Sequence, residues 1–209
     1  MAARLFLLSP ASCHGRRAQI LLNPTAEFSL ARRLRGPNGV PLGEAFSFLS
    51  GLYFRGKLAY ANRFEKAFFP GQSVLVITAG RGLLAATRPV NVADLGAFVD
   101  VPIDLADARY RTPLVRDAEQ IAQQLGPGDE VVLLGSIATD KYCGPLGEVF
   151  GQRLLFPSEF IGRGDMSRGG LMLRSVDEGR ELDYIPVQGA LRRGKRPAKL
   201  PKRETNHPS

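Results

Sequence analysis

The sequence has few of the residues that build disulfide frameworks or metal centres. Its two cysteines, Cys13 and Cys143, are too few for a disulfide scaffold or for a zinc site made of cysteines. The two histidines, His14 and His207, argue against a histidine-based metal centre, so we expect neither a metal nor a cofactor. A cysteine-poor chain is typical of a reducing cytoplasm, which is the location we expect.

Long apolar runs are also missing. The first run, Leu5–Leu8, is followed at once by Ser9 and Pro10, so it is shorter than the apolar region of about 7–15 residues in a secretory signal. No run approaches the roughly 18–20 apolar residues that span a bilayer, so we expect no membrane partner. The 44% of hydrophobic residues is nevertheless enough for an ordinary globular core.

The positive charge is concentrated at one end of the chain. The formal net charge is +8, and the stretch 192–204, with seven cations and one anion, supplies all but two of these charges. Because a segment rich in Pro, Lys and Arg cannot bury enough apolar surface to fold, we expect one domain over 1–190 and a disordered basic tail over 191–209. Such a tail either contacts nucleic acid or only keeps the protein in solution.

Short apolar runs alternate along the chain with segments of helical spacing. Continuous runs of Val, Ile and Leu are typical of strands buried in a parallel sheet, and their alternation with helices indicates an α/β fold with an open, mostly parallel sheet flanked by helices. The expected strands are residues 4–8, 73–78, 130–134 and 153–156, and the clearest expected helices are 41–66 and 113–125. Residues 171–174 and 182–186 are expected to close the domain as a C-terminal hairpin.

Loops rich in glycine, hydroxyl groups and cations follow the first three strands. In open parallel sheets, ligands bind outside the carboxyl ends of the strands, so these loops are the expected site. The first loop supplies Ser12, Cys13, His14, Arg16 and Arg17. Its guanidinium groups suit a phosphate or carboxylate. Cys13 is a candidate nucleophile, with a small buried cysteine in a surface loop as the ordinary alternative.

The loops after the second and third strands add further candidate ligand contacts. These are Gly80, Arg81 and Gly82 in the second loop, and Ser136, Thr139, Lys141 and Tyr142 in the third. Paired glycines suggest a tight turn near a ligand, although a turn with positive φ needs glycine in any case. Hydroxyl groups and a lysine at an expected helix start suit an anion, although ordinary helix capping uses the same residues.

The glycine-rich segment 162–170 contains two arginines, an aspartate and a serine, a composition that a mobile, ligand-covering loop would use. Its candidate ligand contacts are Arg163, Ser167 and Arg168, and Asp165 is the first candidate for a general base or a metal contact. A docking element for a partner protein is the alternative interpretation of the same loop.

Aromatic and basic residues interleave over 51–64. Tyr53, Lys57 and Tyr60 are candidate ligand contacts, because cations can contact phosphates while rings stack on bases. The alternative is an amphipathic helix whose aromatic residues lie in the core and whose cations lie in solvent.

Several short motifs occur in a shared order along residues 5–145. They are Ser12-Cys13, a helix with Leu52-Tyr53, Lys57 and Tyr60-Ala61, a strand Val74–Ile77 followed by Gly82-Leu83-Leu84, and Gly135 to Tyr142. In this order they resemble a group of uncharacterised bacterial α/β domains related to the peroxide-stress-protein family. Arg16 and Arg17 stand where lysines are usual in that group. The resemblance implies links to nucleic acid and to nucleobase-modifying or glycosylase-like folds, and it implies no catalytic residues.

We therefore expect a nucleotide, nucleobase or nucleic-acid ligand in a crevice at the carboxyl ends of the strands, with glycosylase- or transferase-like chemistry as a candidate activity. In that reading Arg16, Arg81, Arg163 and Arg168 neutralise phosphate and Asp165 handles a proton. One alternative is a non-catalytic nucleic-acid-binding protein that uses the basic tail and the cations of residues 52–64. The other is a partner-binding protein. Convergence of the four loops favours the first.

Overall fold

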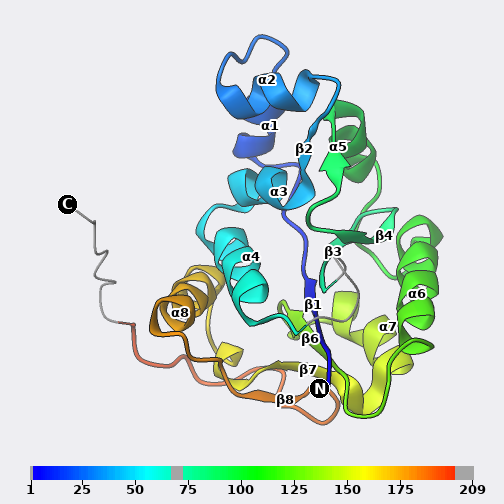
Figure 1. The fold of residues 1–209 in the computed structure, drawn as a ribbon, viewed down its shortest axis with the longest axis vertical. Coiled ribbons are helices and arrows are strands. Elements are labelled where there is room, and N and C mark those ends of the chain that lie inside the picture. Colours follow the sequence, from blue (N-terminus) through cyan, green and yellow to red (C-terminus); the bar gives the residue numbers. More distant parts are fainter. Residues whose placement is uncertain (1, 67–72, 201–209) are drawn as a thin grey trace.

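The computed structural model describes residues 2–66 and 73–200, and a six-stranded sheet runs through it (Figure 1). The strands are β1 (Arg4–Leu8), β3 (Val74–Thr78), β4 (Gly82–Ala85), β6 (Glu130–Leu134), β7 (Leu154–Pro157) and β8 (Tyr184–Pro186). They lie in the order β4-β3-β1-β6-β7-β8, in which β3, β1, β6 and β7 are parallel and the two edge strands are antiparallel. The predicted fold class, a mostly parallel sheet flanked by helices, is confirmed.

The central strand β1 is buried along its whole length, which explains its continuous apolar sequence. It pairs with β3 on one side, where Leu7 is level with Leu75, and with β6 on the other, where Leu7 is level with Leu133. Helices cover both faces of the sheet, with α4 and α8 on one side and α6 and α7 on the other (Figure 1).

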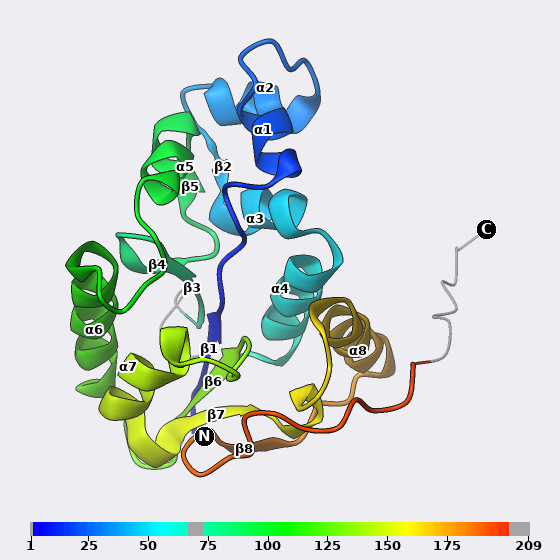
Figure 2. The same cartoon turned by 180° about the vertical axis from the view of Figure 1, so that it is seen from behind.

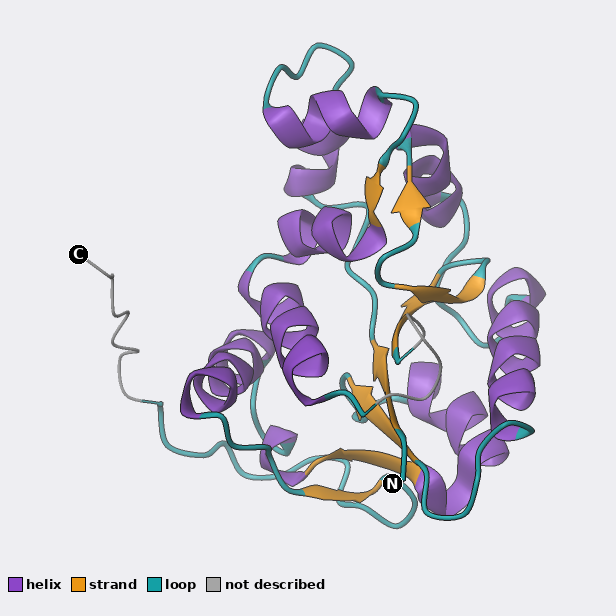
Figure 3. Ribbon diagram, viewed as in Figure 1, coloured by secondary structure: helices purple, strands orange, loops and turns teal. Residues whose placement is uncertain are grey.

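Eight α-helices lie in the described part of the chain (Figure 3). They are α1 (Arg16–Leu22), α2 (Ser29–Arg35), α3 (Leu42–Ser50), α4 (Leu52–Phe64), α5 (Val92–Val99), α6 (Ala108–Ala122), α7 (Asp140–Phe150) and α8 (Asp165–Glu178). A short antiparallel ribbon of β2 (Val40–Pro41) and β5 (Pro89–Val90) lies beside α3. None of the helices in the described residues has the length and apolar character that crossing a bilayer requires.

The helix predicted over 41–66 is two helices, because Gly51 adopts φ +65° between α3 and α4. The helix predicted over 113–125 begins earlier, at Ala108, where the carboxylate of Asp107 accepts the backbone N–H of Arg109. This side-chain cap satisfies a backbone donor that the helix leaves unpaired.

The predicted C-terminal hairpin is wrong. Residues 171–174 belong to helix α8, and β8 pairs instead with β7, with Ile185 level with Phe156. The glycine-rich segment predicted as a loop is also largely helical, because α8 begins at Asp165. Glycine disfavours helices in isolation, but a tertiary contact that only glycine permits can override this preference.

That contact joins α4 to α8. A Cβ built on Gly56 would lie 2.7 Å from the carbonyl oxygen of Gly169, and one built on Gly169 would lie 2.8 Å from the carbonyl oxygen of Leu52. The two helix backbones therefore touch, and neither position has room for a side chain.

The C-terminal segment 191–200 contains no helix or strand, yet it lies against the folded body. Figure 2 shows it running past α8 toward the C-terminus. Arg192 pairs with Asp140 at 2.6 Å, and a Cβ on Gly162 would collide with the carbonyl oxygen of Lys195. The rest of the predicted disordered tail, residues 201–209, lies outside the described residues.

The glycine contact predicts a sharp difference between two neighbouring positions. Gly169→Ala is expected to lower the free energy of unfolding by about 1–3 kcal/mol, because the new methyl group meets backbone that cannot rotate away. Gly170→Ala is the matched control, since a Cβ there meets only side-chain atoms, the nearest at 3.5 Å. It is expected to be neutral or to stabilise α8 by up to about 1 kcal/mol. Equal effects in urea unfolding would contradict this account.

Candidate functional site

A cavity of about 800 Å³ opens at the carboxyl ends of β1, β3 and β6. The chain crosses from β1 to β3 on one side and later to β6 on the other, so the end of β1 is a topological switch point. Each of the four loops singled out in the sequence contributes at least one residue to the lining. The second contributes Ala79 and the fourth contributes Asp165. The four loops therefore converge.

Ten of the predicted site residues line this cavity. They are Ser12, Cys13, His14, Arg16, Arg17, Tyr53, Ser136, Lys141, Tyr142 and Asp165. They come from the loop after β1 and the start of α1, from α4, from the segment after β6 and the first turn of α7, and from the first residue of α8. Residues far apart in sequence thus meet where strand order reverses.

Arg17 has a structural contact of its own. Its Nη1 donates a hydrogen bond of 3.1 Å to the carbonyl oxygen of Phe48 near the end of α3. A Cβ on Gly51 would collide with the same guanidinium group, so Arg17 lies directly over the break between α3 and α4. Arg16, at the start of α1, is exposed at the rim of the cavity.

The turn between β3 and β4 lies outside the cavity lining apart from Ala79. Gly80 and Gly82 have φ of +81° and +65° and form a tight strand-to-strand connection. Arg81 pairs with Asp94 of α5, and its guanidinium carbon lies 5.8 Å from the centre of the Phe98 ring. Phe98 lines the cavity, so Arg81 contacts a residue of the cavity wall without lining the cavity itself.

Four further candidates also lie outside the lining. Thr139 occupies the N-cap position of α7 without a side-chain capping bond. Arg163 donates to the carbonyl oxygen of Glu159 and to Ser167 Oγ, at 3.0 and 3.2 Å. Arg168 donates to the carbonyl oxygen of Phe160 and approaches Asp165 Oδ1 to 3.4 Å. Arg168 therefore lies beside the site, next to Asp165 and close enough to Tyr53 to lower the pKa of its hydroxyl.

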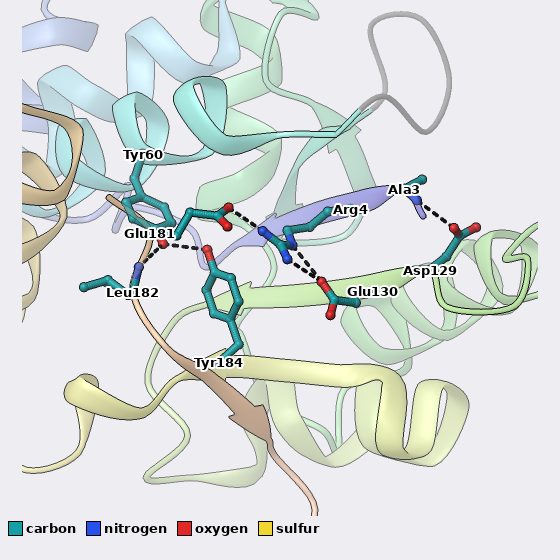
Figure 4. Close-up of polar contacts among 8 residues, drawn as sticks. All are labelled: Ala3, Arg4, Tyr60, Asp129, Glu130, Glu181, Leu182 and Tyr184. Atoms are coloured by element: carbon teal, nitrogen blue, oxygen red, sulfur yellow. Dashed lines mark hydrogen bonds and ion pairs between the residues drawn. The ribbon is translucent and has the colours of Figure 1, made fainter. Parts of the chain in front are cut away.

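Tyr60 lies at the opposite end of the sheet from the cavity (Figure 4). Its hydroxyl is hydrogen-bonded to the Tyr184 hydroxyl and accepts the N–H of Leu182 at 2.9 Å. Nearby, Arg4 at the start of β1 pairs with Glu130 and Glu181. This cluster fastens β8 to the amino end of the central strands.

Cys13 is buried in the cavity wall, and burial raises the pKa of its thiol to about 11. A nucleophilic cysteine needs the thiolate, which cationic or polar surroundings stabilise and apolar ones do not. At neutral pH Cys13 is therefore a protonated thiol. This fits the alternative interpretation, a small buried cysteine, better than a nucleophile.

Lys57 lies beneath the cavity floor and is completely buried. Its Nζ donates to the backbone carbonyl oxygen of Ser9 and to Ser9 Oγ, the latter at 2.9 Å. The rings of Tyr53 and Phe54 lie 4.4 and 4.8 Å from Nζ. Loss of hydration lowers the pKa of this amine to about 7, and the negative charge of Asp165 opposes the shift only in part.

Tyr53 lines the cavity, and its hydroxyl group lies within the cavity wall. The residue is 7% exposed, and among the described residues its buried hydroxyl oxygen has no hydrogen-bond partner. Burial raises its pKa to about 12, with Arg168 lowering it and Asp165 raising it to a lesser extent. The hydroxyl is therefore a neutral group beside a carboxylate. Buried polar atoms are nearly always paired, so an unpaired hydroxyl in a cavity wall can gain a partner when a small shift of the wall brings it into contact with a ligand.

None of the apolar residues in the cavity lining is predicted as a site residue from the sequence. It comes from α3, from α5 and from the irregular segment before α6, and consists of Phe46, Leu49, Phe98, Val101 and Ile103. Val101, Ile103 and Leu105 alternate with the exposed residues Pro102 and Asp104, a period that in this segment marks one side of an extended chain packing on the core.

Within the described ranges, no cluster of three or more His, Cys, Asp or Glu side chains is arranged to hold a metal ion. The polar groups of the cavity are instead hydroxyls, cations and two carboxylates, Asp104 and Asp165.

Comparison with known proteins gives no match: no family model matches the sequence, and no curated protein or solved structure matches it either.

The buried amine predicts an unusual pH dependence of stability. Between about pH 7 and pH 10.5 the unfolded chain keeps a proton on Lys57 that the folded protein has lost, so raising the pH through this range stabilises the folded state. The free energy of unfolding of the wild type, relative to Lys57→Met, is expected to rise by up to about 1.4 kcal/mol per pH unit between pH 7 and 9.

Denaturant unfolding at several pH values measures this difference. Arg55→Met, on the exposed face of the same helix, is the matched control, because an arginine does not titrate in this range. A difference between wild type and Lys57→Met that is constant with pH would show that the buried amine keeps its proton.

Proposed function

We propose that the cavity binds a nucleotide or a free nucleobase. The observation that carries the proposal is the buried, unpartnered hydroxyl of Tyr53 in a cavity at the switch point of a parallel sheet. A buried hydroxyl without a partner lowers the free energy of unfolding, and a ligand atom that pairs with it removes this loss.

The size and lining of the cavity fit a planar ligand that carries an anionic group. Its volume of about 800 Å³ lies within the range of about 300–1,000 Å³ that is typical of small-molecule sites. Phe46, Phe98 and Tyr142 offer aromatic surface, and exposed Arg16 and Lys141 offer positive charge. Rings suit the base, and cations at the rim suit a phosphate.

The polar corner of the cavity supplies both donors and acceptors. The Tyr53 hydroxyl can donate to a ring carbonyl or ring nitrogen, and the Asp165 carboxylate can accept N–H groups of the base. Arg168 Nη1, from the same helix α8, lies 3.4 Å from Asp165 Oδ1. In this arrangement Asp165 is the proposed proton-handling residue of any reaction at the site.

Among the alternatives, nucleic-acid binding through α4 has less support. Lys57 of that helix is completely buried, so it cannot contact a phosphate in solvent. Of the three cations in α4, Arg55 and Arg63 are exposed. The resemblance to the peroxide-stress-protein group agrees with a nucleobase-related ligand and stays a prediction.

Tyr53→Phe tests the proposal, because the hydroxyl is predicted to oppose folding and to favour binding. Without ligand, the variant is expected to be as stable as the wild type or more stable by about 1 kcal/mol, since an unpaired buried group is removed. In the wild type, the right nucleotide or nucleobase at about 100 times its dissociation constant should add about 2.7 kcal/mol, or roughly 5–10 °C in melting temperature. The variant should lose much of that shift.

The measurement is thermal unfolding against a panel of nucleotides, nucleobases and inorganic phosphate. Tyr110→Phe is a matched control, because Tyr110 is also buried but its hydroxyl already donates to the carbonyl oxygen of Lys141 at 2.7 Å. It should lower stability and leave the ligand-induced shift intact. A panel that produces no shift in the wild type would refute the proposal.

A further inference from the structure

A second hollow, of about 340 Å³, lies between the beginning of α8 and residues 196–200. Four cationic side chains line it: Arg163 and Arg174 from the α8 side, and Arg196 and Lys199 from the C-terminal segment. None of the described residues that line it is acidic. We call this hollow the basic groove.

The C-terminal wall of the basic groove is fixed to the folded body just before the groove begins. Arg192 pairs with Asp140, and Gly194 packs so closely on Ile161 that a Cβ there would lie 2.5 Å from Ile161 Cγ2. Gly162 packs on the carbonyl oxygen of Lys195. Arg196 and Lys199 are therefore presented from a held segment, and their side chains are exposed.

On the opposite wall the cations are oriented by their own neighbours. Arg163 is held by the carbonyl oxygen of Glu159 and by Ser167 Oγ, and Arg174 Nη1 donates to the carbonyl oxygen of Gly170 at 3.3 Å. The acceptors of Arg163 are uncharged, so they orient its guanidinium group without neutralising it. Met166, which is 67% exposed, and Leu200 add apolar surface between the cations.

A row of cations on both walls, with apolar surface between them, matches a ligand with repeated negative charges and apolar units between them. A phosphodiester backbone has this chemistry, since arginine binds phosphate oxygens in a bidentate way and sugars cover apolar side chains. The described part of the chain supplies no aromatic ring to the groove, and thus no stacking surface for bases. The expected binding is therefore insensitive to base sequence.

We propose that the basic groove binds the phosphodiester backbone of a single-stranded nucleic acid. This goes beyond the ligand proposed for the cavity and does not depend on it. The two sites are nevertheless neighbours, because Asp165 lines the cavity whereas Gly164 and Met166, on either side of it in the chain, line the groove.

Fluorescence anisotropy with a labelled single-stranded DNA of mixed sequence, at several salt concentrations between 50 and 200 mM, tests this proposal in the full chain. Arg196→Gln/Lys199→Gln is expected to weaken binding several-fold. It should also make the logarithmic salt dependence shallower by roughly 1.4, since each phosphate contact to a single strand contributes about 0.7. Both side chains are exposed, so the variant is expected to unfold at the wild-type temperature and to keep any nucleotide-induced shift of the cavity.

Lys202→Gln/Arg203→Gln is the matched control, because it removes the same charge from the same end of the chain at positions outside the described residues. A clearly smaller loss than in the groove variant supports the proposal. Equal losses in the two variants would show that only the charge of the C-terminal end matters, and would overturn it. The proposal would also be overturned if the groove variant bound the DNA as tightly as the wild type does. Tighter binding of an acidic peptide or of anionic lipid vesicles than of the DNA would overturn it as well.

Discussion

The two hydrogen bonds from Lys57 to Ser9 join helix α4 to the end of the central strand β1. The loop that forms much of the cavity lining leaves the sheet at this point, so its course depends on where Ser9 is held. The amine is enclosed by the rings of Tyr53 and Phe54 and is cut off from water. A buried group of this kind is tolerated only where its partners are fixed, because an unpaired amine in a dry interior is costly.

Helix α4 is fixed in turn by α8, through the contact between Gly56 and Gly169. The same α8 presents Asp165 to the cavity and Arg174 to the basic groove, and its Met172 is buried in the core. One helix therefore sets the distance between the two proposed sites. A displacement of α8 would alter the polar corner near Tyr53 and the groove wall together.

The strands and the place of the site could be predicted from the sequence. Runs such as Val74–Ile77 are continuous because both faces of the strand are buried, and loops that follow parallel strands must meet at one edge of the sheet. Asp165 was singled out from composition alone, although for a loop rather than the first turn of a helix. Composition indicates a loop there because local propensity contains nothing about the α4 backbone that Gly169 contacts.

Other features of the site depend on contacts that no local pattern contains. An interleaved lysine such as Lys57 normally lies in solvent, and only the position of Ser9 in three dimensions turns it into a buried donor. The unpartnered state of the Tyr53 hydroxyl is likewise a property of its surroundings. The hydroxyl of Tyr60, on the same helix, is fully paired at the other end of the sheet. Two tyrosines with one apparent role in the sequence thus have different roles in the fold.

The strand order also has a consequence for how the chain folds during synthesis. The central strand β1 is made first, but its partners β3 and β6 follow about 70 and 126 positions later, as the pairs Phe6 with Val74 and Arg4 with Glu130 show. Until the ribosome has released β6, the apolar side chains of Leu5–Leu8 have no complete sheet to enter. Long-range pairing of this kind slows folding and leaves apolar surface open to aggregation in the meantime. The nascent chain therefore leaves this apolar strand without its second partner until Leu134, the end of β6, has emerged.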